Sequence, residues 1–150
     1  MARADHQATV RSADVRTATA VTDHAALLAA AQRARQNAYA PYSRFRMGAA
    51  VLTDTNAIVT GALVENVSLG LAMCAERVAL FTTVAAGERP TAVAVASART
   101  NGVLTFPCGA CLQVALELGG SGVQVLAVDP DGHFEAATVG ELLPRGPHKI

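Results

Sequence analysis

Three cysteines and one glutamate have a spacing that suits metal chemistry. Cys108 and Cys111 form a C-x-x-C pair directly after Pro107, and Cys74 precedes Glu76 in Cys-Ala-Glu. The C-x-x-C spacing suits zinc, and a catalytic zinc ion typically has three protein ligands and one position for water or substrate. None of the four histidines is beside the cysteines in the sequence. We therefore interpret Cys74, Cys108 and Cys111 as the ligands of one catalytic zinc ion.

Glu76 is the candidate acid–base group of such a centre. In the first turn of a helix, a carboxylate two residues after a metal ligand can lie over the open face of the metal. There it could take a proton from the attacking water and pass it to a leaving group. Both ligand segments are expected at helix starts, where free N–H groups and the helix dipole stabilise thiolates.

Each of these features also has a simpler interpretation. A lone C-x-x-C can be a thiol redox pair. Taken by itself, the pair favours metal binding and all other roles about equally. A free cysteine such as Cys74 is usually a buried core residue, and Glu76 alone would be a solvated acid in a first helical turn. The combination of the two motifs, in this order along the chain, favours the open zinc site.

The elements that must position these residues alternate between helix and strand. Three helices are expected at 23–39, 72–88 and 109–120, with a short one at 140–144, and strands at 46–53, 57–64, 91–98, 122–129 and 133–139. The apolar strand 91–98 is expected at the centre of the sheet, covered on both faces. This alternation predicts a single α/β domain over residues 22–150. Residues 1–21 lack a sustained period and are expected to form a mobile extension, with the first helix beginning near Thr22 or Asp23.

Composition limits the classes of partner. The chain has 12 basic and 12 acidic residues and only 4% aromatic residues, which disfavours binding to a nucleic-acid polymer or an anionic membrane. The N-terminus lacks the apolar core of a secretory signal, so a cytoplasmic location is expected. Three cysteines, an odd number, disfavour a disulfide framework. The charged fraction of 16% is low for a small monomer and favours an oligomer.

Over residues 23–145 the chain strongly resembles the cytidine deaminase family in its small, three-cysteine form. The resemblance is carried by the segments YAPYSRFRMGAAV, VENVS, CAER and PCGACLQ. It implies a three-layer α/β/α fold with a mixed sheet of about five strands. It also implies one Zn²⁺ per chain, a homotetramer, and zinc-dependent hydrolytic deamination of cytidine or 2′-deoxycytidine to the uracil product plus ammonia, a reaction of pyrimidine salvage.

The resemblance also assigns roles around the zinc ligands. Glu76 corresponds to the proton shuttle and Arg77 to an arginine that faces the zinc thiolates. Phe45 corresponds to a phenylalanine that packs against the pyrimidine, and Glu65 to the acid that accepts a hydrogen bond from a sugar hydroxyl. Ala75 corresponds to a residue whose backbone contacts the base.

Four positions depart from the family pattern. Leu63, Leu69, Leu112 and Pro147 stand where the family has Asn, Tyr, Arg and a C-terminal Phe. Because these positions concern the sugar, the base and the thiolates, an alternative substrate is a modified cytosine compound such as a nucleoside antibiotic of the blasticidin S type. A non-catalytic module that binds zinc or a nucleoside is an alternative of another class, and the intact Glu76 counts against it.

Overall fold

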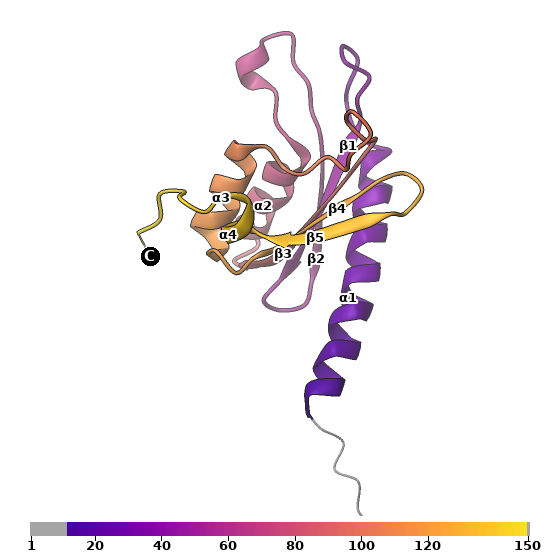
Figure 1. The fold of residues 1–150 in the computed structure, drawn as a ribbon. Helices are drawn as coiled ribbons and strands as arrows, with labels where there is room; N and C mark the ends of the chain where they lie inside the picture. Colours follow the sequence, from indigo (N-terminus) through magenta and orange to yellow (C-terminus); the bar gives the residue numbers. More distant parts are fainter. Residues whose placement is uncertain (1–11, 150) are drawn as a thin grey trace, which may run out of the picture.

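The computed structural model describes residues 12–149, with side chains from residue 24 onward. The elements in chain order are α1 (Ser12–Arg35), β1 (Met47–Thr53), β2 (Ile58–Ala62), the 3-10 helix η1 (Leu69–Leu71), α2 (Ala75–Ala85), β3 (Pro90–Ser97), α3 (Gly109–Gly119), β4 (Gln124–Val128), β5 (Phe134–Thr138) and α4 (Val139–Leu142). Figure 1 shows their arrangement. Four of the strands lie within the ranges predicted for them, and β3 begins one residue before its predicted range, at Pro90. Apolar runs bounded by turn residues mark strands clearly.

The five strands form one mixed sheet in the order β2-β1-β3-β4-β5. β1 pairs antiparallel with both β2 and β3, so β2 and β3 run in the same direction. β3 pairs parallel with β4, and α3 makes the crossover that this pairing requires. Residues 92–97 of β3 are all buried, which confirms the prediction of a central strand.

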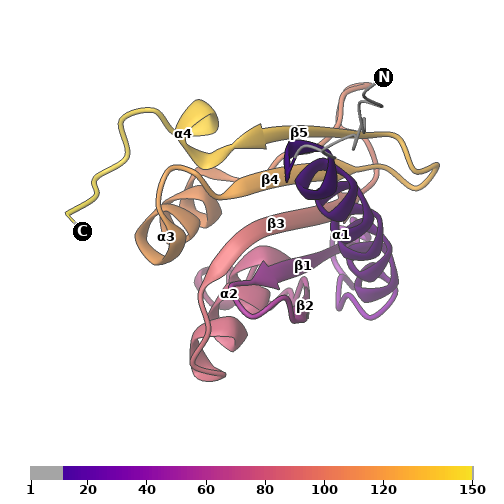
Figure 2. The same ribbon diagram turned by 90° about the horizontal axis from the view of Figure 1, so that it is seen from below.

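Helices cover both faces of the sheet. On one face α1 packs through Leu27, Leu28 and Ala31 against Ala50, Ala94 and Leu126. On the other face α2 and α3 pack through Ala79, Leu80, Leu112 and Leu116 against Ala49, Val51 and Val93. Figure 2 shows α1 and α3 on opposite sides of the sheet. The predicted three-layer α/β/α architecture is confirmed.

Helix α1 begins at Ser12, well before the predicted start near Thr22 or Asp23. No glycine or proline occurs before Pro41, so nothing in the sequence terminates a helix in this region. Figure 1 shows that the first turns of α1 extend past the sheet. Residues 12–22 have no sustained apolar periodicity, so the sequence carried no signal for this part of the helix. Residues 1–11 lie outside the described residues, and the mobility of residues 1–21 stays a prediction.

Among the described residues, no helix is both long enough and apolar enough to cross a bilayer.

Candidate active site and metal centre

The two helix starts that carry the cysteines meet at one edge of the sheet. Because β2 and β3 run in the same direction, α2 and α3, which follow them, both begin at the same edge. Cys74 is the N-cap of α2, Cys108 is the N-cap of α3, and Cys111 lies in the first turn of α3. Their sulfur atoms lie within 4.8 Å of one another, and the Cys108 and Cys111 sulfurs are 3.5 Å apart. The predicted cluster is therefore present.

The donor set of this cluster fits zinc. All three cysteines are free thiols. A zinc–sulfur bond of about 2.3 Å in tetrahedral geometry places neighbouring sulfurs somewhat under 4 Å apart, close to the Cys108–Cys111 separation. Among the described residues no histidine, fourth cysteine or carboxylate joins the three cysteines as a further ligand. Three soft ligands with an open fourth position are typical of catalytic rather than structural zinc sites.

Arg77 supplies a positive charge next to the thiols. Its Nη2 donates a hydrogen bond to the Cys74 sulfur at 3.4 Å. The pKa of Cys74 is lowered to about 5, first by a hydrogen bond from Cys111 and then by the Arg77 guanidinium. The same contact with Cys74 raises the pKa of Arg77. The same sulfur–sulfur contact raises the pKa of Cys111. A metal ligand must be deprotonated, so Cys74 is the thiol that this arrangement prepares for a metal near neutral pH.

Glu76 is buried beside the cluster without a full set of hydrogen bonds. Its side chain is 2% exposed, and its Oε2 atom has no hydrogen-bond partner among the described residues. Burial raises the pKa of Glu76 to about 7. A carboxyl group with such a pKa can both accept and donate a proton near neutral pH, as an acid–base catalyst must.

Gly61 of β2 allows α2 to lie directly on the sheet. A Cβ atom at this position would lie 2.4 Å from the Ala75 carbonyl oxygen and 2.5 Å from the Ala79 nitrogen. Only glycine fits so close an approach of two backbones. This residue was not predicted from the sequence, where its only signal is an isolated glycine inside a strand pattern.

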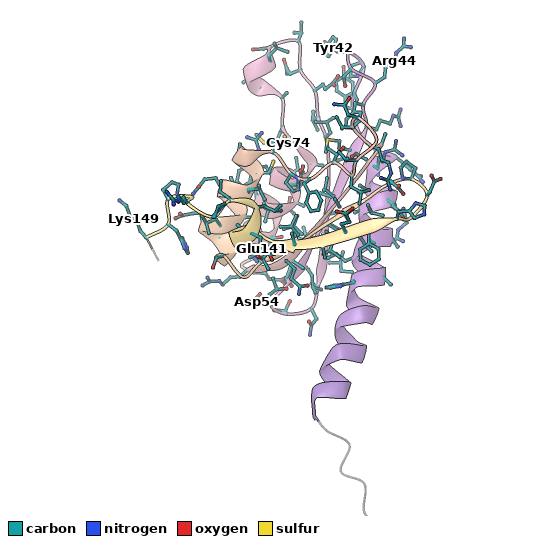
Figure 3. The ribbon with its side chains drawn as sticks, in the orientation of Figure 1. Tyr42, Arg44, Asp54, Cys74, Glu141 and Lys149 are labelled. Carbon is teal, nitrogen blue, oxygen red and sulfur yellow. The ribbon has the colours of Figure 1, made fainter. Side chains whose placement is uncertain are left out.

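A small backbone ladder links the segment before β1 to Cys74. Isolated β-bridges join Tyr39 to Val64 and Val64 to Met73. The Glu65 N–H donates to the Tyr39 carbonyl at 2.8 Å, and the Met73 N–H donates to the Val64 carbonyl at 2.9 Å. Figure 3 shows Tyr42 and Arg44 at the same end of the molecule as Cys74. The half-buried Phe45 belongs to this segment, whereas Ala75 is fully buried at the first position of α2.

The four unusual positions lie in different settings. Leu112 is 7% exposed and packs in the core with Ala79 and Leu116. Leu63 is half-buried, and Leu69 is 88% exposed on η1. The Pro147 carbonyl accepts a hydrogen bond from Gln113 Nε2 at 2.8 Å, which holds the C-terminal segment on α3.

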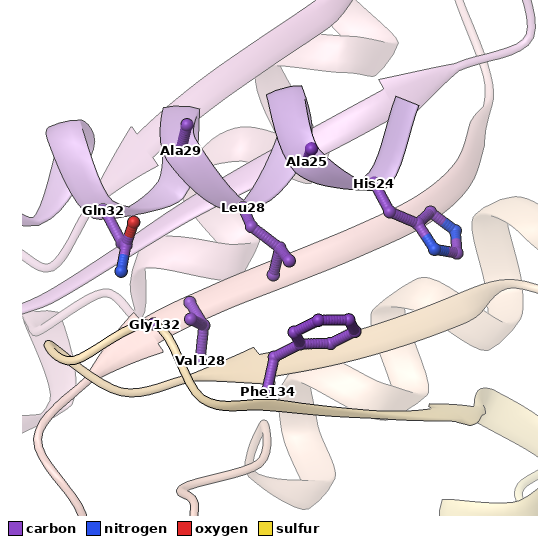
Figure 4. A pocket seen from close by; sticks show the side chains of 8 residues that line it. All are labelled: His24, Ala25, Leu28, Ala29, Gln32, Val128, Gly132 and Phe134. Atoms are coloured by element: carbon purple, nitrogen blue, oxygen red, sulfur yellow. The ribbon is translucent and has the colours of Figure 1, made fainter. Parts of the chain in front are cut away.

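Two further features lie away from the cysteines. Asp129, Asp131 and His133 also cluster, but the Asp129 carboxylate is satisfied by Arg99 at 2.8 Å and by two backbone N–H groups of its own turn. A cavity of about 280 Å³ lies between α1 and the β4–β5 hairpin, on the opposite face of the sheet from α2 and α3 (Figure 4). Its lining is mostly apolar and includes Leu28, Val128 and Phe134. We assign neither feature to the catalytic centre.

Comparison with known proteins agrees with the geometry. The family model described as "Cytidine and deoxycytidylate deaminase zinc-binding region" matches residues 21–127. A cytidine deaminase of Halalkalibacterium halodurans is 43% identical over 122 residues, which are 81% of this chain and 92% of that protein. One of Mycobacterium tuberculosis is 41% identical over 114 residues, 76% of this chain and 81% of that protein.

Solved structures show the same relationship. A crystal structure of cytidine deaminase from Burkholderia pseudomallei has a TM-score of 0.77 at 46% identity, covering 83% of this chain and 98% of that chain. The cytidine deaminase structure from Mycobacterium tuberculosis has a TM-score of 0.69 at 41% identity, covering 83% and 96%.

An α/β/α domain with three thiols at two helix starts and a buried carboxylate beside them defines a zinc-dependent hydrolytic enzyme. Within that class the chain belongs to the cytidine and deoxycytidylate deaminase family. Zinc is its cofactor, and the cluster of Cys74, Cys108 and Cys111 fits the metal.

Proposed function

We propose that this protein deaminates cytidine or 2′-deoxycytidine by hydrolysis, giving the uracil nucleoside and ammonia. The observation that carries the proposal is the placement of Glu76, buried and incompletely hydrogen-bonded, beside three thiols that lie within 4.8 Å of one another. The relatives named above are cytidine deaminases and share about two fifths of their aligned residues with this chain.

Glu76 moves the protons of this reaction. When bound, zinc acts as a Lewis acid that makes water a usable nucleophile at neutral pH. Glu76 accepts a proton from the attacking water and delivers it to N3 of the cytosine ring. As the water oxygen completes its bond to C4, Glu76 takes the second proton and gives it to the departing amino group. The C4–N bond then breaks, ammonia leaves, and the ring retains a carbonyl oxygen.

Other residues of the site balance the charge of the cysteine centre and orient the substrate. Arg77 compensates the negative charge of the cysteine centre through its contact with Cys74. Ala75 is fully buried at the first position of α2, and we assign its backbone groups to the base. We assign Phe45 to packing against the pyrimidine and Glu65 to a sugar hydroxyl. Support for the role of Glu65 is its place on the ladder that leads to Cys74, and Phe45 is half-buried in the segment between this ladder and β1.

We also propose a homotetramer in the cytoplasm, with a role in pyrimidine salvage. The exposed apolar side chains of Val67, Leu69 and Leu71 support association, because contiguous exposed apolar surface commonly marks a protein interface. The outermost part of residues 1–21 is proposed to be dispensable for deamination.

A substrate panel tests the proposed function. Cytidine, 2′-deoxycytidine, free cytosine and blasticidin S are each incubated with the protein, and the loss of absorbance on conversion to the uracil compound is followed. We expect turnover of the two nucleosides and about one zinc ion per chain by metal analysis. A protein that is free of metal and fully active would refute the proposal. A strong preference for blasticidin S would instead support the alternative substrate, a modified cytosine compound, which was inferred from positions such as Leu63 and Leu69 that depart from the family pattern.

A further inference from the structure

The segment from Tyr42 to Phe45 is held by the carboxylate of Glu65. Glu65 Oε2 accepts the backbone N–H of Tyr42 at 2.9 Å and the backbone N–H of Ser43 at 3.3 Å. Glu65 Oε1 accepts the Ser43 hydroxyl. Three donors from two neighbouring residues therefore converge on one side chain. The Ser43 hydrogen bond is the first cause that lowers the pKa of Glu65, so the acceptor is ionised at neutral pH.

Ser43 extends this contact to Phe45. Its hydroxyl oxygen accepts the Phe45 N–H at 3.0 Å while its proton points to Glu65. Between the two, Arg44 has a positive φ of 58°, a left-handed conformation that is unfavourable for residues other than glycine. The Arg44 N–H donates to the Ala40 carbonyl at 3.0 Å and closes the turn. Such a backbone persists only where surrounding contacts impose it, and Glu65 and Ser43 supply them here.

The holding side chain is itself fixed relative to the metal centre. The Glu65 N–H donates to the Tyr39 carbonyl, and its neighbour Val64 exchanges two backbone hydrogen bonds with Met73, the residue before Cys74. An ionised carboxylate offers about four acceptor positions. The described contacts use three of these, two on Oε2 and one on Oε1, which leaves about one, on Oε1, for a further donor.

We propose that Ser43 and Glu65 form a clamp that positions Phe45 relative to the cysteine centre, and that Ser43 is thereby a positioning residue for deamination. Glu65 then has two tasks: it holds the loop, and its remaining acceptor position takes one hydroxyl of the substrate sugar. This inference rests on the proposed function for its kinetic consequence, but the clamp is a property of the free protein and can be measured without substrate.

The first test is hydrogen–deuterium exchange of residues 41–46, read by mass spectrometry on the zinc-loaded protein without substrate. A hydrogen bond to a charged group is strong enough that its loss should speed exchange of this segment about tenfold in Ser43→Ala and in Glu65→Gln. Ser121→Ala is the matched control, because this exposed serine follows the C-terminal end of α3, whereas Cys108 and Cys111 lie at its start. Unchanged exchange in both clamp variants would overturn the proposal. Because no substrate is present, this result is independent of whether cytidine is turned over.

The second test compares cytidine with 2′,3′-dideoxycytidine, which lacks the 2′ and 3′ hydroxyls of the sugar and keeps only the 5′ hydroxyl. A clamp requires that Ser43→Ala and Glu65→Gln each lower kcat/KM for both substrates, by about tenfold. On dideoxycytidine the double variant should be no slower than the worse single variant, because the two residues act through one contact. Ser43→Thr, which keeps the hydroxyl, should recover most of the activity. If Glu65→Gln affects cytidine alone, Glu65 is only a sugar contact and the clamp is wrong.

Discussion

Glu76 is buried beside three thiols, and in the metal-free protein this burial brings the pKa of its carboxyl group close to neutral pH. Burial raises its pKa to about 7, whereas an exposed glutamate would be ionised throughout the neutral range. The Oε2 atom has no hydrogen-bond partner among the described residues, so nothing in that part of the chain competes with substrate for it. A group that must accept and then donate a proton is most effective when its pKa lies near the working pH.

Replacing Glu76 with glutamine should therefore abolish turnover and leave the metal in place. The amide is nearly isosteric but cannot carry the proton, and general acid–base catalysis contributes about 100-fold to 10,000-fold to a rate. We expect kcat for cytidine to fall by at least that range, with zinc content unchanged by metal analysis. Glu117→Gln, on the exposed side of α3, is the matched control. Full activity of Glu76→Gln would show that another group moves the proton.

The raised pKa of Glu76 also predicts a pH-dependent cost to folding in metal-free protein. The group is protonated more readily when folded than when unfolded, so its favourable contribution is complete below about pH 4.5 and is lost as pH rises through about 7. The difference amounts to about 3 kcal/mol in the free energy of unfolding. Denaturant titrations of chelator-treated wild type and Glu76→Gln should therefore diverge between pH 5 and pH 8, with the variant relatively more stable at pH 8. Parallel pH profiles would contradict the prediction.

At the scale of elements, the approach of α2 to the sheet determines where Cys74 and Glu76 lie. Gly61→Ala would place a Cβ atom 2.4 Å from the Ala75 carbonyl oxygen, so the start of α2 would have to move away. Overpacking of this kind typically costs about 1–3 kcal/mol. We expect a loss of stability of that size in denaturant titrations and weaker zinc retention in a chelator competition. Gly122→Ala, whose added methyl group meets nothing within 4 Å, should change neither. Unchanged zinc retention in Gly61→Ala would separate this packing from the metal centre.

The sequence predicted the elements and the metal ligands better than the contacts between elements. Strand positions followed from apolar periodicity, which is a local signal. The approach of Cys74 to Cys108 followed instead from the chemistry of the two motifs, which together supply the three ligands of an open zinc site. The start of α1 at Ser12 was missed because residues 12–22 carry no apolar periodic pattern. The fit of Gly61 against α2 and the hydrogen bonds of Glu65 to residues 42–43 depend on pairs far apart in the chain. Periodicity within one segment carries no information about such pairs.

At the scale of the whole molecule, the composition and the exposed apolar side chains both favour an oligomer. Half of the residues are hydrophobic, 51%, and only 16% are charged. Within the described residues, Val67, Leu69 and Leu71 expose apolar side chains on or beside η1. Figure 1 shows this short helix at the end of a loop that projects from the sheet. The same loop continues directly into Cys74, so a partner chain packed against it would also contact the edge of the catalytic centre.

An aspartate at position 69 should therefore weaken both assembly and activity. Leu69 is 88% exposed, so Leu69→Asp costs the isolated chain little, whereas an unpaired charge buried in an interface is strongly unfavourable. Light scattering should give about four times the 15.4 kDa chain mass for wild type and a smaller species for the variant. Loss of a central interface contact should lower kcat/KM for cytidine by about tenfold or more. Leu69→Met, which conserves volume and polarity, should stay assembled and active. A monomeric wild type, or a fully assembled and active Leu69→Asp, would show that this loop faces solvent.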